Sequence, residues 1–203
     1  MKAGGDMKHF GFPQHVLIVG ILLVSAMIAL RISNAQERTY KIGDRGPAGG
    51  WIFYDKGDST GGWRYLEAAP DDQGTAIWGC LNVNEITGFE TEVGTGKINT
   101  ERIIKQCNEK DTAAQLAVRY KGGGVTDWYL PSVGELRLMR DNLAKNDGKG
   151  FKPESYWSSS FAFINLVHTV VFKKEEKKDK GVFSNTMATK DSRKVRVRAV
   201  RSF

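Results

Sequence analysis

The residues best suited to bind a ligand are the cations of the C-terminal stretch "RKVRVRAVRSF", residues 193–203. Lys194, Arg196 and Arg198 alternate here with small apolar residues, a pattern typical of a strand with one buried and one exposed face. Guanidinium groups form paired hydrogen bonds with sulfate or carboxylate oxygens. The pattern therefore predicts a polyanion-binding strand in which Arg196 and Arg198 act with weaker support from Arg193 and Lys194. Alternatively, these cations pair with acidic residues on neighbouring strands.

The distribution of charge points to the same part of the chain. Residues 173–201 hold eleven basic and four acidic residues and so account for the whole net charge of +7. Such asymmetry favours an anionic partner, namely an acidic polysaccharide, an acidic envelope surface or nucleic acid. The mixed-sign run "KKEEKKDK", residues 173–180, is most simply explained as a solvated hairpin tip.

Three aromatic residues are candidates for stacking against sugar rings: Trp128, Tyr129 and Trp157. Their rings combine an apolar face with a polar group, as carbohydrate platforms require. The simpler interpretation places them in the core, where "DWYLPSVGEL" (residues 127–136) directs a helix against a sheet.

Neither a catalytic residue nor a metal ligand set is predicted. His168 is the only histidine after residue 15, and it lies inside an apolar strand pattern without the nucleophile and acid of a triad. The serines of "YWSSS" (residues 156–160) lack a Gly-x-Ser-x-Gly turn. Asp71 and Asp72 alone are too few oxygen ligands for calcium. We therefore expect a non-enzymatic binding module without a cofactor.

The first 35 residues have the features of an export signal. Lys2 and Lys8 precede an apolar run, residues 16–30, which is followed by the small-x-small pattern that ends at Ala35. Cleavage after Ala35 would leave a domain of residues 36–203. The alternative is an uncleaved membrane anchor, because Arg31 flanks the run, although a spanning helix needs about 20 apolar residues. Export argues against nucleic acid, and we expect membrane contact only through this segment.

Export also determines how the two cysteines are interpreted. Cys80 and Cys107 are the only cysteines, and an oxidising compartment favours a disulfide between them. The bond would close a 28-residue loop, for which chain entropy suggests about 3 to 4 kcal/mol of stabilisation.

Hydrophobic periodicity and turn residues predict an α+β domain of short antiparallel strands packed with two or three helices. Ser132 and Glu135 form a capping-box pattern that starts a helix at about Val133, with an end expected near residues 146–148. Two further helices are expected, one from Asn99 or Thr100 to residue 107 and one after Asp111. Strands are expected at residues 51–54, 63–68, 156–160, 166–172 and 194–199.

Five motifs, taken in order, resemble a bacterial family long catalogued as a domain of unknown function, which includes the C-terminal domain of a collagen-like adhesin. They are "IGDRGPAGGWIFYDKG", "GWRYLEAAP", "YKGGGVTDWYLPSVGELRLM", "YWSSS" and "VRVRAVR". The resemblance implies a fold similar to C-type lectin and formylglycine-generating-enzyme domains. It also implies an extracellular or envelope location and, for some members, binding of sulfated glycans. The chain departs from the family pattern in residues 161–191, where members often carry further Trp and Gly residues.

Formylglycine-generating activity is not expected, because its paired copper-binding cysteines lie towards the C-terminus and no cysteine follows Cys107. The sequence therefore predicts an extracytoplasmic, adhesin-like module that binds an anionic polysaccharide or envelope polymer. The alternative function is a structural or protein-binding component of the cell envelope.

Overall fold

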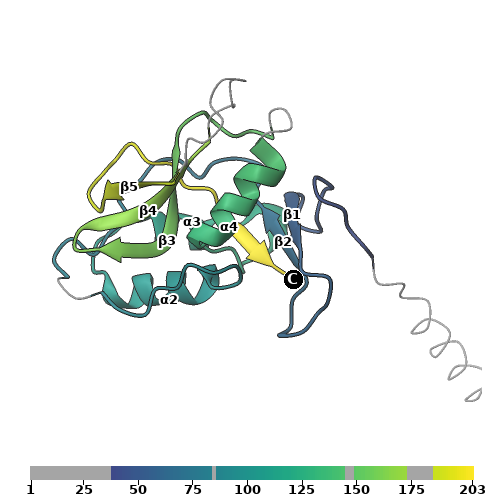
Figure 1. Cartoon of the computed structure of the whole chain (residues 1–203), viewed down its shortest axis with the longest axis horizontal. Helices are drawn as coiled ribbons and strands as arrows, with labels where there is room; N and C mark the ends of the chain where they lie inside the picture. The colour runs from purple at the N-terminus through teal and green to yellow at the C-terminus, as the bar shows by residue number, and fades with distance from the viewer. Residues whose placement is uncertain (1–37, 84–85, 145–148, 173–184) are drawn as a thin grey trace, which may run out of the picture. The chain divides into compact units, whose positions relative to one another are not determined.

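The computed structural model describes residues 38–83, 86–144, 149–172 and 185–203. One compact unit, Tyr40–Phe203, holds every described helix and strand, both hydrophobic cores and a disulfide (Figure 1). This unit therefore contains what a domain needs to fold by itself. The expected signal peptide or anchor, residues 1–35, and the run 173–180 lie outside the described residues. Among the helices that are described, none is long and apolar enough to cross a bilayer.

The domain is α+β, as predicted, with two antiparallel sheets of three strands each. The first sheet contains β1 (Trp51–Asp55), β2 (Tyr65–Ala68) and β6 (Val200–Ser202), in the order β1-β2-β6. The second contains β3 (Ser155–Phe163), β4 (Leu166–Val171) and β5 (Asn185–Thr189), in the order β3-β4-β5. The predicted N-terminal hairpin is confirmed, because Trp51 pairs with Ala68 and Asp55 with Tyr65.

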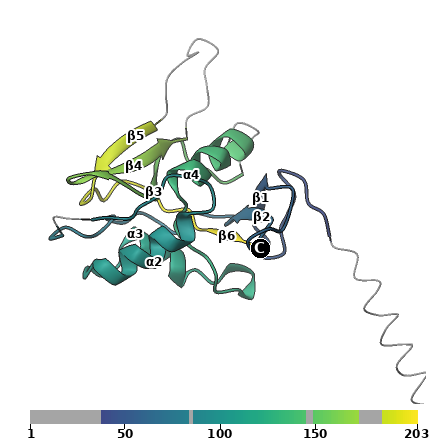
Figure 2. The same cartoon turned by 60° about the horizontal axis from the view of Figure 1, so that its bottom comes forward.

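The described residues form three short helices: α2 (Gly96–Gln106), α3 (Ala113–Arg119) and α4 (Val133–Met139). A 3-10 turn, η1 (Gly122–Gly124), follows α3, and a π-helical turn, η2 (Arg140–Ala144), extends α4. The expected end of this last helix, residues 146–148, lies outside the described residues. Contacts join α2 to β3, and α4 to both β3 and β4. Figure 2 shows α2 and α3 together on the side of the domain away from β5.

The start of α4 is the one that the sequence predicts. Ser132 Oγ accepts a hydrogen bond from the backbone N–H of Glu135 at 3.2 Å, and Glu135 Oε2 accepts from the N–H of Ser132 at 2.8 Å. Helix α2, by contrast, begins at Gly96, three residues before Asn99. Asn99 does not cap the helix, because its side chain is bonded to the backbone of Glu90. Its Oδ1 accepts from the Glu90 N–H at 3.0 Å, and its Nδ2 donates to the Glu90 carbonyl at 2.7 Å.

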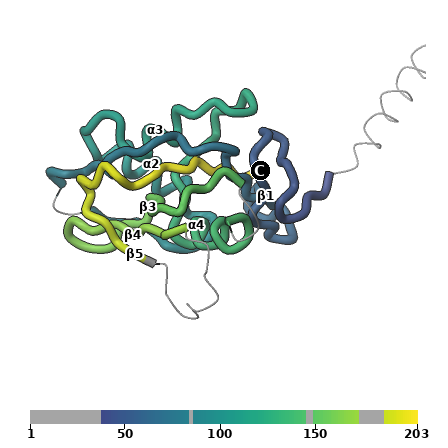
Figure 3. Tube along the Cα trace, turned by 90° about the horizontal axis from the view of Figure 1, so that it is seen from above, coloured from purple at the N-terminus to yellow at the C-terminus, as the bar shows by residue number. Residues whose placement is uncertain are grey.

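The C-terminal stretch is an inner segment of the fold rather than a surface strand. Residues 195–197 are hydrogen-bonded on one side to residues 73–76 and on the other to residues 155–157, where β3 begins. Figure 3 shows this terminal segment, in yellow, running between its two neighbours. Val195, Val197 and Ala199 are buried, as the alternation predicts, but a regular strand forms only from Val200 onwards.

Candidate functional site

Arg198 is the most deeply buried of the candidate cations. Its side chain is 0% exposed, and its Nε donates to Asp72 Oδ1 at 2.7 Å. Its two terminal nitrogens donate to the carbonyl oxygens of Ala69 and Gly150, both at 2.8 Å. The guanidinium carbon also lies 4.2 Å from the centre of the Phe151 ring. The prediction that Arg198 faces a ligand is therefore wrong, because the segment that carries it is enclosed by other parts of the chain.

Arg196 is also paired with acidic residues of the same chain, although its contact with Glu154 lies at the surface. Its Nε and Nη2 form a bidentate pair with the Glu154 carboxylate, at 2.9 Å and 2.8 Å, and its Nη1 lies 3.4 Å from Asp72 Oδ2. The hydrogen bond from Arg196 lowers the pKa of Glu154, and Glu154 in turn raises the pKa of Arg196. The outward-facing row of guanidinium groups is thus corrected to a set of internal ion pairs, which was the alternative interpretation.

The remaining two candidate cations differ from these arginines. Arg193 and Lys194 are exposed, on the turn that leads from β5 to the terminal segment. Neither makes an ion pair with any acidic residue in the described part of the chain. They are the two cations of the predicted set that remain accessible to a partner.

The predicted stacking platforms are core residues. Trp128, Tyr129 and Trp157 are almost completely buried, so no ring face is open to a sugar. Each indole N–H has an internal acceptor: Trp128 Nε1 donates to the Gly122 carbonyl at 3.1 Å, and Trp157 Nε1 to the Ala76 carbonyl at 2.9 Å. The prediction of sugar stacking is wrong for all three, because their rings are buried. The indole N–H that could bind a sugar instead donates to a backbone carbonyl in the core.

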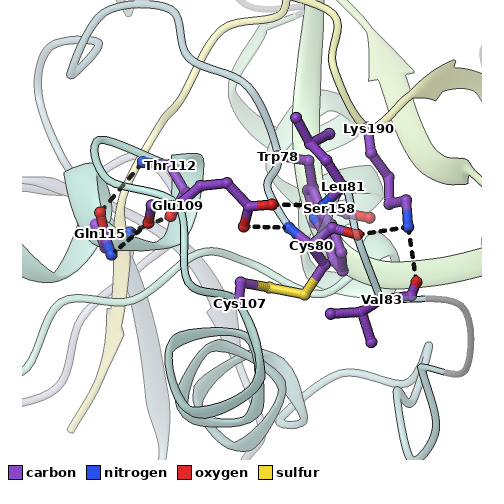
Figure 4. The surroundings of a disulfide bond; sticks show 10 residues. All are labelled: Trp78, Cys80, Leu81, Val83, Cys107, Glu109, Thr112, Gln115, Ser158 and Lys190. Atoms are coloured by element: carbon purple, nitrogen blue, oxygen red, sulfur yellow. Dashed lines mark hydrogen bonds between the residues drawn. A yellow bond between two sulfur atoms is a disulfide. The ribbon is translucent and has the colours of Figure 1, made fainter.

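Cys80 and Cys107 form the predicted disulfide, and Figure 4 shows what surrounds it. The Glu109 carboxylate accepts from the backbone N–H groups of Cys80 and Leu81, at 2.8 Å and 2.7 Å. The Lys190 ammonium donates to the carbonyls of Cys80 and Val83, at 2.7 Å and 3.2 Å. Burial lowers the pKa of Lys190, whereas Glu109 opposes this effect. The loop at residues 80–83 is therefore held by the disulfide, by the Glu109 carboxylate and by the Lys190 ammonium group.

A cluster that the sequence analysis missed is formed by two cations at one indole ring. The Arg45 guanidinium carbon lies 3.5 Å from the centre of the Trp51 ring, and Lys149 Nζ lies 3.8 Å from the same centre. Arg45 also donates to the Gly49 carbonyl, and Lys149 to the Gly43 carbonyl at 3.0 Å. Neither cation has a carboxylate partner within the described ranges. No sequence signal links Lys149 to Trp51, because almost a hundred residues separate them.

Two shallow hollows, of about 400 Å³ and 290 Å³, meet at Ile104 and Val118 between α2 and α3. The charged side chains that line them are Lys97, Glu101, Lys110, Asp111, Arg119 and Asp127. Because both signs are present in equal number, this groove offers no net attraction for a polyanion.

Among the residues that the structure describes, no three His, Cys, Asp or Glu side chains gather in a way that could hold a metal ion. His168 is half-buried on β4, and burial, together with the charge of Arg137, lowers its pKa.

Comparison with known proteins adds no family to these observations. No protein-family model matches the chain, and no curated protein matches it. What the geometry defines is an α+β domain with a disulfide, internally paired C-terminal arginines, and a separate pair of cations at Trp51.

Proposed function

We propose that this chain is a non-enzymatic, extracytoplasmic binding module that recognises an anionic polysaccharide or another acidic polymer of the cell envelope. The observation that carries the proposal is the pair of cations, Arg45 and Lys149, at Trp51. The Cys80–Cys107 disulfide supports an oxidising location. The resemblance of five motifs to the adhesin family, and the lectin-like fold that this resemblance implies, favour the same class of function.

The Trp51 cluster is suited to an anion because no carboxylate of the described residues forms an ion pair with Arg45 or Lys149. An indole face stabilises a cation, but it provides no negative charge to balance two of them. Each cation donates to one backbone carbonyl, which leaves further N–H groups of Arg45 and Lys149 able to bind oxygen atoms. Sulfate and carboxylate groups offer such oxygens in a geometry that guanidinium recognises.

Elution from immobilised heparin in a salt gradient tests this proposal, with the domain of residues 36–203 as the sample. Arg45→Gln combined with Lys149→Gln removes two charges while keeping part of the aliphatic stem of each side chain. We expect this variant to elute at lower salt, with an affinity at least about tenfold weaker, since a hydrogen bond to a charged group contributes about 1.5 to 3 kcal/mol.

The matched control is Lys105→Gln combined with Lys110→Gln, which removes the same charge from two exposed positions. If both pairs of substitutions shift elution equally, net charge alone attracts the polymer and the Trp51 cluster is not its site. A second variant, Arg193→Gln with Lys194→Gln, measures what the exposed terminal cations add.

The alternative function is a structural or protein-binding envelope component that does not bind glycans. The specific observation in its favour is the internal pairing of Arg196 and Arg198, which shows that half of the predicted cation set serves the fold. Failure of the wild-type domain to bind heparin even at low salt would favour this alternative over a polyanion-binding module.

A further inference from the structure

Four of the exposed large apolar side chains come from three segments that meet at Lys190. They are Leu81, Phe163, Ile164 and Met187. Lys190 connects the three segments that carry them. Its backbone N–H donates to the carbonyl of Asn165 at 2.9 Å, beside the β3–β4 turn, and its ammonium donates to the carbonyls of the 80–83 loop. Figure 1 shows the β3–β4 turn and the chain after β5 at the end away from the C-terminus. We call these four side chains and their segments the apolar end.

The turn between β3 and β4 has an unusual residue at its tip. Phe163 pairs with Leu166, which leaves Ile164 and Asn165 as a two-residue loop. Ile164 has φ +53°, in the left-handed region that a β-branched residue rarely adopts, and it is 75% exposed. Two-residue hairpins with a positive φ at the first position usually place glycine, asparagine or aspartate there. An exposed isoleucine at this position does not help the fold, so a contact with another molecule explains it better.

The shape of the apolar end favours a deformable partner. Its side chains project from turns and from an edge strand, and none of them lines the hollows between α2 and α3. Protruding apolar tips fit poorly into a rigid protein surface without a matching groove. The interface of a lipid bilayer, however, accepts them without prior shaping.

The exposed cations near the apolar end favour a bilayer with anionic headgroups. Arg193 and Lys194 are exposed on the turn that follows Lys190, with one exposed acid, Asp191, beside them. Among the described residues, Glu109 is a further acid at this loop, and its carboxylate accepts from the backbone N–H groups of Cys80 and Leu81. Residues 1–35 contribute +2 of the net charge of +7, leaving +5 on the rest of the chain. A basic domain is attracted to anionic phospholipid headgroups.

We propose that the apolar end docks onto a membrane surface containing anionic phospholipids. Phe163 and Ile164 enter the interface between headgroups and acyl chains, while Arg193 and Lys194 contact headgroup phosphates. The disulfide and the Lys190 hydrogen bonds order the apolar end beforehand, so binding loses little conformational entropy. The proposal does not depend on the Trp51 cluster and is separate from polymer binding there.

Vesicle flotation tests the proposal with the domain of residues 36–203, which lacks the N-terminal apolar run. The vesicles are phosphatidylcholine alone, or phosphatidylcholine mixed with phosphatidylglycerol. We expect binding to the mixed vesicles and at least about tenfold weaker binding to the zwitterionic ones. Ile164→Gly removes the side chain while suiting the turn, so it should weaken binding about tenfold without lowering thermal stability. Ile98→Ala, at an exposed position on α2, is the matched control and should bind like wild type.

Several results would overturn the proposal. Binding to neither kind of vesicle rejects it, and so does binding that Ile164→Gly leaves unchanged, because charge alone would then account for attachment. A concentration-dependent dimer that Ile164→Gly dissociates would show that a second copy of the chain covers the apolar end instead. None of these results alters heparin elution by the Arg45 and Lys149 variant, so the two proposals can fail independently.

Discussion

Arg198 is a buried cation whose charge is balanced by the carboxylate of Asp72. Transferring both charges out of water is unfavourable, and their attraction offsets this only when the remaining donors are also satisfied. In Arg198, the two terminal nitrogens donate to the carbonyls of Ala69 and Gly150. Arg198 therefore connects three distant parts of the chain, and its role in this structure is to stabilise the fold.

Replacing Arg198 should destabilise the domain strongly. Arg198→Met keeps much of the side-chain volume but leaves Asp72 with a weaker partner in Arg196, so we expect a loss of about 3 to 5 kcal/mol in the free energy of unfolding. Lys194→Met, at an exposed position, should change it by less than about 0.5 kcal/mol. Urea unfolding curves of both variants provide the measurement. Similar small effects from the two substitutions would mean that Arg198 is not a structural residue.

Glu135 shows how a helix cap can be placed in a core. Backbone N–H groups of Ser132, Gly94 and Gly96 donate to its carboxylate and favour the charged form. Burial has the larger effect and raises the pKa of Glu135 from 4.5 to about 7. The folded protein therefore binds this proton more tightly than the unfolded chain does.

This raised pKa predicts a pH dependence of stability. The contribution of Glu135 is fully present below pH 4.5 and is lost as pH rises through about 7, with a maximal loss of roughly 3 kcal/mol at about 1.4 kcal/mol per pH unit. The lowered pKa of His168 acts in the opposite direction: its contribution to stability is fully present above pH 6.5 and is lost as pH falls through the lowered pKa of the folded state. Comparison with Glu135→Gln isolates the first effect. Unfolding free energies that run parallel with pH in the two proteins would contradict it.

At the level of elements, α3 and α4 are each only seven residues long and each begins with a capping box. Helices of this length are unstable alone and depend on caps and tertiary contacts. Ser132 Oγ also donates to the Glu92 carbonyl at 2.7 Å, so the cap of α4 holds the preceding loop as well. The two hydrogen bonds of the Thr112 cap are longer, at 3.3 Å and 3.4 Å.

These differences predict unequal effects of removing the two caps. Ser132→Ala should lower the free energy of unfolding by about 1 to 2 kcal/mol, and Thr112→Ala by about 0.5 to 1 kcal/mol, because a buried capping hydroxyl with two partners is lost only in the first case. Thr126→Ala, at an exposed position outside a helix, serves as the control. Thermal unfolding ranks the stability of the three variants. A larger loss of stability in Thr112→Ala than in Ser132→Ala would contradict the prediction that the α4 cap contributes more.

The sheets are elements of a different kind, because their stability depends on distant partners. The terminal segment is hydrogen-bonded to residues 73–76 and to the start of β3, and then forms β6 beside β2. The last ten residues of the chain thus contact both sheets. The alternating pattern correctly predicted that Val195, Val197 and Ala199 are buried, but it did not predict that Arg198 on the opposite face is buried as well.

At the scale of the whole molecule, the Cys80–Cys107 bond closes a loop that includes α2. The loop limits the unfolded chain, and its ends also support the Lys190 contacts at the apolar end. Reduction should therefore loosen one end of the domain as well as lower its overall stability.

Reduction of the Cys80–Cys107 disulfide should lower the thermal stability of the domain. A loop of this length stabilises a domain by about 3 to 4 kcal/mol in the chain-entropy model, so the midpoint of thermal unfolding should fall clearly in the presence of a reductant. The double variant Cys80→Ala with Cys107→Ala should unfold at the lower midpoint and show no response to reductant. An unchanged midpoint of the wild-type domain on full reduction would show that the bond adds little.

Several features were determined by the sequence alone because they depend on neighbouring residues. The capping box of α4, the first hairpin and the burial of Val195 and Val197 follow from spacings of a few positions. The pairing of the cysteines was also predictable, since only two are present and the export signal favours oxidation.

Only the tertiary structure decided what the charged and aromatic side chains do. Arg198 and its partner Asp72 are 126 positions apart, and Lys149 reaches Trp51 from a different part of the chain. Whether a guanidinium binds a ligand or an internal carboxylate, and whether an indole faces solvent or the core, depends on which distant segments lie beside it. Local pattern gives the direction of a side chain, but the fold supplies its neighbours.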